Sequence, residues 1–173
     1  MRGCLKSFIA SRGREERIKG SYVLIIENRE DRSIEVGKLG VIHFRRGFYA
    51  YTGSAMGGIE ARLDRHLRPE KRMFWHIDYI LAEMNIVGLI FSETKNSKDR
   101  YECAIARRLA SSFEPIESFG SSDCCCRSHL FYSTRYEDLH AESLIAFIDP
   151  HSDSNSMIRA LASSGIGMVS FFE

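Results

Sequence analysis

Residues 48–68 read FYAYTGSAMGGIEARLDRHLR, and this stretch decides the fold. Its first part, residues 48–52, is rich in aromatic residues and predicts a strand that Gly53 ends. Apolar side chains then recur at every fourth position, at Ile59, Leu63 and Leu67. This spacing predicts a helix over residues 58–68 with one core-facing stripe, ended by Pro69. The stretch is therefore a strand followed closely by a helix.

Upstream of this stretch the sequence predicts a buried strand and a hairpin. Residues 22–26, YVLII, form a continuous apolar run with β-branched side chains, which is typical of a buried strand. Residues 34–36 and 41–44 flank the sequence GKLG at 37–40. This arrangement predicts a hairpin whose glycines supply the unusual backbone angles of the turn.

Downstream, helical and strand patterns alternate. We expect helices at 75–84, 101–111 and 136–147, and strands at 86–91 and 130–132. Alternation around one small sheet predicts an α/β or α+β domain, which we place at residues 20–147. A basic arm, 1–19, would precede it, and a linker with a tail, 148–173, would follow. The apolar piece at 167–172 could pack on its own domain or on a second copy, so we expect a monomer or a weak homodimer.

The length and overall composition of the chain suit one domain with an additional segment at each end. The chain has 173 residues, 44% hydrophobic and 27% charged, enough to bury a core without cross-links. Its five cysteines are odd in number and three are consecutive, unlike a secreted disulfide framework. No apolar run reaches the length of a membrane span, and the basic N-terminus lacks the apolar core of a signal peptide. We therefore expect a cytoplasmic protein with no membrane partner.

The charge distribution leaves the partner open. A net charge of +1 neither favours nor excludes nucleic acid. Basic residues do cluster at 1–20 and 62–72, and with Arg45 and Arg46 they could form a phosphate-facing side. A solvated charged face is the alternative interpretation.

Arg62 and His66 are four residues apart, so on a helix they share one face. That face flanks the apolar stripe and would lie at the rim of the sheet. A guanidinium beside an imidazole could clamp a phosphate, because arginine offers a fixed charge and histidine can exchange a proton near neutral pH. An ordinary amphipathic helix with a basic flank explains the same spacing.

A set of residues spread over much of the chain resembles the GIY-YIG nuclease signature. Its elements here are Gly20 and Tyr22 opening a strand, Tyr51-Thr-Gly53 before a helix with Arg62 and His66, then His76, and Glu102 in a later helix. The segments WHIDY, ECA and SSDC are similar to those of an uncharacterised archaeal-type branch of this family. Some members of that branch are fused to endonuclease III-like glycosylases. The resemblance covers residues 20–132 and implies a small, mainly antiparallel sheet flanked by helices, with the hairpin as an insertion.

The resemblance implies a metal-dependent nuclease that hydrolyses phosphodiester bonds, with DNA favoured as substrate. Glu102 would hold Mg²⁺ or Mn²⁺, which prefer carboxylate oxygen. Tyr22 would act as base or position the attacking water, and Tyr51 would orient water or phosphate. Arg62 would neutralise charge on the phosphate. The remaining implied site residues are His66 and His76 for proton transfer or phosphate binding, and Gly53, Ser54 and Arg65 for substrate binding.

The chain also departs from the family pattern. Tyr22 and Tyr51 are 29 positions apart (22 to 51), farther than is usual, and the hairpin that separates them could alter or cover the site. The asparagine that often ends the family motif is missing, and His129 could replace it.

Two alternatives to a nuclease stay open. One is a non-catalytic nucleic-acid-binding module of the same fold.

The other alternative is a zinc-stabilised interaction domain. Cys124, Cys126 and His129 offer three soft ligands, and zinc would need a fourth. His76, Asp123 or Cys103 could supply it. Buried free cysteines that act as small apolar residues explain the same stretch without a metal.

Overall fold

A computed structural model describes residues 17–94, 101–148 and 166–170 of the chain. Within these residues six antiparallel strands form one sheet in the order β6-β7-β4-β1-β5-β8. The strands are β1 (Gly20–Asn28), β4 (Gly47–Ala55), β5 (Asn85–Glu93), β6 (Glu114–Pro115), β7 (Leu130–Ser133) and β8 (Ile166–Ser170). The expected α+β fold with a mainly antiparallel central sheet is confirmed.

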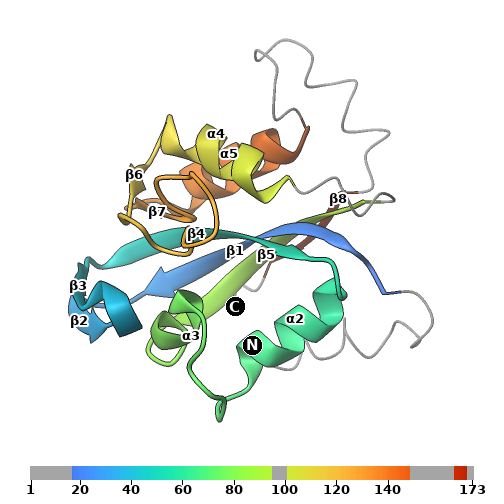
Figure 1. The fold of residues 1–173 in the computed structure, drawn as a ribbon. Coiled ribbons are helices and arrows are strands. Elements are labelled where there is room, and N and C mark those ends of the chain that lie inside the picture. Colours follow the sequence, from blue (N-terminus) through green and yellow to red (C-terminus); the bar gives the residue numbers. More distant parts are fainter. Residues whose placement is uncertain (1–16, 95–100, 149–165, 171–173) are drawn as a thin grey trace.

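Helices cover both faces of this sheet (Figure 1). α2 (Ile59–Leu67) and α3 (His76–Ile80) lie on one side, and α4 (Glu102–Ala110) and α5 (Tyr136–Ile148) lie on the other. Along β1, Tyr22, Leu24 and Ile26 enter the core under α2 and α3. Val23 and Ile25 enter the core under α4 and α5. The apolar run of β1 is unbroken because both of its faces are buried.

The predicted hairpin is present as a separate two-stranded sheet. β2 (Arg32–Glu35) and β3 (Val41–Phe44) pair in antiparallel register around a short 3-10 turn, η1 (Gly37–Leu39). Gly37 and Gly40 have φ of 48° and 72°, which side chains other than glycine rarely adopt. Phe44 is fully buried in the core on the α3 side, so the hairpin packs as part of the domain.

Two boundaries differ from the sequence prediction, and the position of the tail was left open by it. Gly53 does not end its strand, because β1 pairs with β4 as far as the Gly20–Ala55 pair. The helix expected at 75–84 is shorter, ending at Ile80, because the chain turns at residues 81–83 to enter β5. Met84 is still buried in the same core. The tail pairs through β8 with β5, so of the two alternatives it packs on its own domain.

The arm at 1–19 lies mostly outside the described residues. At its end, Arg17 lies beside Gly58, the residue before α2. Ile18 is buried, and its carbonyl accepts a hydrogen bond of 2.8 Å from the backbone N–H of Ile59. The described part of the domain thus includes residues before Gly20. Among the described helices none has the length and apolar character that crossing a bilayer requires.

A candidate active-site pocket at the edge of the sheet

The candidate site lies where β7 stops running beside β4. β4 pairs with β1 along its whole length, but with β7 only from Phe48 to Tyr51. One further bond, from the N–H of Thr52 to the carbonyl of His129 (2.9 Å), extends the ladder. Beyond it, no described strand pairs with β4 on this side. The pocket opens at this uncovered end of β4.

The pocket gathers residues from both sides of the sheet. Its lining is Tyr22, Tyr51, Thr52, Gly53, Ser54, Arg62, His66, Trp75, Glu102, Cys103, Gly120, Asp123, Cys124 and His129. Seven of the residues predicted from the sequence are among them: Tyr22, Tyr51, Gly53, Ser54, Arg62, His66 and Glu102. Arg65 and His76 do not line it. No residue of the β2–β3 hairpin lines it either, so the insertion leaves this pocket uncovered.

Tyr22 and His66 form the buried floor of the pocket. The Tyr22 hydroxyl lies 2.9 Å from Nε2 of His66. Burial, with nearby Lys71 and Arg62, lowers the pKa of His66 to about 3. Burial also raises the pKa of Tyr22 well above its usual value. Both groups are therefore neutral near pH 7, since each charged form is poorly solvated here.

Gly53 makes room for the Tyr22 ring. The two residues are paired across β1 and β4. A Cβ on Gly53 would lie 2.7 Å from the Tyr22 hydroxyl oxygen, closer than such atoms can pack. Tyr51 stands next to them, its ring centroid 6.4 Å from that of Tyr22. Burial raises the pKa of Tyr51 as well. The absence of a side chain at Gly53 thus lets two tyrosines share the pocket.

Arg62 contributes a cation to the pocket wall. Its guanidinium carbon lies 4.3 Å from the centre of the Trp75 ring, and that of Arg65 lies 4.2 Å from the same ring. Arg65 also forms a 2.6 Å ion pair with Asp78. Among the described residues, no carboxylate forms an ion pair with Arg62. Its charge is held in place by Trp75 but remains free for a ligand.

Asp78 anchors the segment that carries Trp75. Its carboxylate is fully buried and accepts hydrogen bonds from Arg65 and from the backbone N–H groups of Phe74 and Trp75. Lys71 approaches its second oxygen at 3.5 Å. A buried carboxylate is tolerated only when it is paired and hydrogen-bonded in this way. Arg65, predicted to bind substrate, thus lies where it fixes Trp75.

Glu102 enters the pocket from the first turn of α4. The preceding backbone N–H, of Tyr101, donates a 3.1 Å hydrogen bond to the Ser21 hydroxyl on β1. This contact holds the start of α4 against the sheet. Oε2 of Glu102 is buried, and no described residue gives it a hydrogen bond. A buried carboxylate oxygen without a partner is unfavourable and fits a site completed by a cation.

His76 lies behind the pocket. Its Nδ1 accepts a 3.0 Å hydrogen bond from the backbone N–H of Gly120, and its ring contacts that of Phe119. Burial lowers its pKa. Gly120 has a φ of 72°, and a Cβ there would lie 3.3 Å from the Tyr51 ring. His76 therefore holds the turn at Gly120 that forms the pocket wall.

Four side chains with soft metal-ligand atoms lie at or next to the pocket that Glu102 enters. Cys103, Cys124, Cys126 and His129 place one atom each within 4.8 Å of one another, and this group could hold a metal ion. Of the three candidates for a fourth ligand beside Cys124, Cys126 and His129, the structure brings Cys103 into the group. Burial raises the pKa of the Cys126 thiol to about 12. Cys125 is exposed and lies outside the group.

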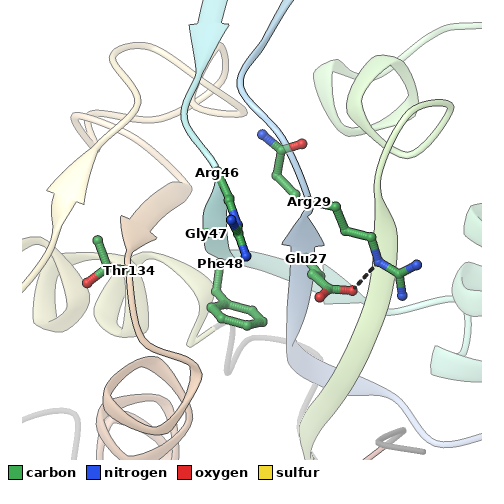
Figure 2. Close-up of a pocket in the computed structure, with 7 residues that line it drawn as sticks. Glu27, Arg29, Arg46, Gly47, Phe48 and Thr134 are labelled. Carbon is green, nitrogen blue, oxygen red and sulfur yellow. Dashed lines mark hydrogen bonds and ion pairs between the residues drawn. The ribbon is translucent and has the colours of Figure 1, made fainter.

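Two other concavities lie on the described surface. One lies at the opposite end of β1 and β4 (Figure 2), six residues along the strands and so roughly 20 Å away. Arg46 lines it, but none of the residues that the resemblance implies for a nuclease site does. Its Glu27 carboxylate is paired with Arg29 at 3.0 Å. The second adjoins Trp75 and is basic and aromatic. Its lining is Arg65, Arg68, Glu70, Lys71, Arg72, Phe74 and Trp75.

Sequence reasoning did not single out Trp75, Thr52 or Asp78. Trp75 is the only tryptophan of the chain, and its place ten residues after Arg65 in a basic segment was the available signal. Asp78 occupies the N3 position of α3, where an acidic residue is read first as a helix cap. Nothing in the local pattern distinguishes Thr52, whose Oγ1 lies 2.8 Å from Nδ1 of His129.

Comparison with known proteins gives one family. The family model described as Domain of unknown function DUF123 matches residues 21–149, and the chain belongs to this family. No curated protein matches the chain, and no solved structure does. The matched range contains every residue that lines the pocket.

Proposed function

We propose that this member of the DUF123 family is a divalent-metal-dependent nuclease that hydrolyses phosphodiester bonds in nucleic acid, with DNA as the favoured substrate. One observation carries the proposal. The same pocket contains the Arg62 guanidinium, which forms no ion pair with a described carboxylate, and the buried Glu102 oxygen that no described residue satisfies. A phosphodiester together with a divalent cation would satisfy both groups, since the anion suits Arg62 and the cation suits Glu102.

Glu102 is the residue that would hold Mg²⁺ or Mn²⁺. Its buried Oε2, to which no described residue donates a hydrogen bond, fits a hard cation, because such a cation prefers carboxylate oxygen and keeps several waters. When bound, such an ion polarises the scissile phosphate and stabilises the leaving oxygen. The Cys103–His129 group is a poor alternative for this ion because thiolates are soft ligands.

The tyrosines are proposed to orient rather than to exchange protons. Because burial raises the pKa of Tyr22, its hydroxyl stays protonated and suits a role in positioning the attacking water. His66, with a pKa of about 3, is a poor proton acceptor and instead orients the Tyr22 hydroxyl through their 2.9 Å contact. Tyr51 would direct its hydroxyl to the phosphate or a water. The sequence analysis expected proton transfer or phosphate binding from His66, and this proposal gives His66 an orienting role instead.

Arg62 would stabilise the charge that develops on the phosphate during attack. Trp75 keeps its guanidinium in place, and Arg65 with Asp78 keeps Trp75 in place. Gly53 and Ser54 lie at the uncovered end of β4, where a substrate backbone could approach without meeting another strand.

The neighbouring basic and aromatic surface supports a nucleic-acid partner. Phe74 is 71% exposed, and Arg72 and the exposed Arg68 lie around the same concavity. Exposed aromatic rings stack on unpaired bases, while cationic side chains follow the phosphates. This surface continues from Trp75, so a strand bound there would lead into the pocket.

We also propose that the family belongs among the GIY-YIG nucleases. The sequence resemblance implies that two strand tyrosines, a strand glycine, a helical arginine and a later glutamate act together. Residues at the corresponding positions, Tyr22, Tyr51, Gly53, Arg62 and Glu102, line one pocket.

The test is cleavage of a panel of labelled single-stranded, duplex and branched DNAs and RNAs with Mg²⁺, with Mn²⁺ or with a chelator. Wild type is compared with Glu102→Gln, and with Glu137→Gln as the control. Glu137 is exposed on α5, where its partner is the surface residue Arg135. We expect metal-dependent cleavage that falls at least about 100-fold in Glu102→Gln, as for loss of a main transition-state contact, and persists in Glu137→Gln.

Binding by wild type with no cleavage of any substrate would contradict the nuclease proposal and support the non-catalytic binding module. Equal cleavage by Glu102→Gln and wild type would exclude Glu102 as the metal ligand.

A further inference from the structure

The four soft ligand atoms beside the pocket have the dimensions of a tetrahedral metal site. The sulfur atoms of Cys103, Cys124 and Cys126 and a ring nitrogen of His129 lie within 4.8 Å of one another. Zinc bonds of about 2.0–2.3 Å imply ligand separations of about 3.6–3.8 Å, so the widest pair needs to close by at most ~1 Å and the closest pair needs to open by ~0.4 Å. The contact from Cys124 Sγ to His129 Nε2 is 3.2 Å.

His129 is already oriented as a ligand. The side chain is 5% exposed, and its Nδ1 lies 2.8 Å from Thr52 Oγ1. Donation of the Nδ1 proton to that hydroxyl would leave the lone pair of Nε2 directed at the cysteines. Metal-binding histidines commonly have their second ring nitrogen held by such a partner. The backbone is fixed too, because His129 N–H donates to the Phe119 carbonyl at 2.7 Å.

The ligands come from separate parts of the fold. Cys103 lies in the first turn of α4, whereas Cys124 and Cys126 lie in the connection that leads to β7 (Figure 1). The described residues 120–129 contain no helix or strand. A bound ion would therefore cross-link an irregular segment to a helix, which is the usual role of a closed zinc site.

We propose that Cys103, Cys124, Cys126 and His129 bind one Zn²⁺ in a closed, four-coordinate structural site. Three thiolates and an imidazole select zinc over Mg²⁺ or Mn²⁺, which prefer oxygen. With all four positions occupied by protein, no position remains for water or substrate. The site is thus distinct from the divalent-ion site proposed at Glu102. Because Glu102 precedes Cys103, the zinc would also hold the first turn of α4 at the pocket wall.

The experiment measures metal content and coordination in the full chain, purified under reducing conditions with no metal added. Wild type is expected to retain about one zinc per chain after dialysis. Cys126→Ser and Cys103→Ser should lose most of it. Cys125→Ser is the matched control, because Cys125 is adjacent in sequence but exposed and outside the group. It should retain zinc at the wild-type level.

A second measurement does not depend on the variants folding. Wild-type protein, stripped of metal and refolded with Co²⁺, should show the intense visible bands of tetrahedral cobalt and the absorption of cobalt–thiolate bonds. Zinc should displace both. Substoichiometric zinc in wild type, an octahedral cobalt spectrum, or equal zinc loss in Cys125→Ser and Cys126→Ser would each overturn the proposal. None of these readouts depends on nuclease activity.

Discussion

The Tyr22 hydroxyl on β1 and Nε2 of His66 on α2 lie 2.9 Å apart in the buried floor of the pocket. The two residues are 44 positions apart in sequence, and their contact joins the sheet to the helix that carries Arg62. Burial favours the neutral form of both groups. This has consequences for how the domain responds to pH.

We expect His66 to make the domain less stable as pH falls. Its folded pKa of about 3 is below the ordinary value of 6.5, so below about pH 6.5 the unfolded chain takes up a proton that the folded chain does not. The contribution of His66 to the free energy of unfolding is therefore fully present above about pH 6.5 and decreases as pH falls toward 3. Between pH 7 and pH 5 the loss from this one group is about 2 kcal/mol.

The measurement is denaturant unfolding of wild type and His66→Gln at both pH values. Glutamine keeps a polar partner for Tyr22 but does not titrate, so the variant should lose about 2 kcal/mol less than wild type on acidification. Other histidines contribute equally to both proteins and cancel. An identical pH dependence in the two proteins would show that His66 titrates normally.

Gly53→Ala should displace the Tyr22 ring. The new Cβ would lie 2.7 Å from the Tyr22 hydroxyl oxygen, and overpacking of this kind costs about 1–3 kcal/mol. Gly57→Ala is the control, because a Cβ there meets no atom within 4 Å. Thermal unfolding should separate the two variants by several degrees. Equal stability of the two variants would be inconsistent with the tight contact between Gly53 and Tyr22.

Asp78→Ala should destabilise the domain far more than Asp64→Ala. Asp78 pairs with Arg65 of α2, and Asp64 pairs with Arg68, which follows the last residue of α2. Asp78 is fully buried, whereas the Asp64–Arg68 pair is exposed. Breaking a buried pair leaves Arg65 and Lys71 without a counter-charge and costs about 3–5 kcal/mol. An exposed pair contributes less than about 1 kcal/mol. Denaturant unfolding of the two variants tests this, and Asp78→Asn replaces Asp78→Ala if the latter does not fold.

Phe74→Ala should weaken binding of single-stranded DNA under the proposed function. A base stacked on an aromatic ring contributes about 1–3 kcal/mol, which corresponds to roughly 5- to 150-fold in affinity. Val41→Ala is the control, because Val41 on β3 is 71% exposed, as is Phe74. Fluorescence anisotropy at one fixed salt concentration measures both variants. Equal affinities would remove Phe74 from the binding surface.

Much of the fold follows from local pattern. The unbroken apolar run of β1 predicted a buried strand, and the fourfold spacing of Ile59, Leu63 and Leu67 predicted the inner face of α2. That spacing also put Arg62 and His66 on one helix face, and both line the pocket. These predictions succeed because strand alternation and helix periodicity depend only on backbone geometry.

Local pattern was misleading at Gly53, where a turn residue lies inside a strand. The reason is tertiary, since β1 continues to pair with β4 and the large partner side chain, Tyr22, occupies the space that a side chain at Gly53 would take. The length of α3 was misjudged for a similar reason, because the position of β5 forces the chain to turn after Ile80.

By itself the sequence determined the central strands, the approximate helices and the identity of most groups that line the pocket, because each depends on neighbours within a few residues. Only the tertiary structure decided which groups meet and in which charge state. The pairing of β7 with β4 extends only as far as Tyr51, and the pocket opens beyond that point. Packing brings Cys103 to Cys124, Cys126 and His129. Burial, which no short segment encodes, then keeps His66 neutral and leaves Glu102 without a hydrogen-bond partner among the described residues.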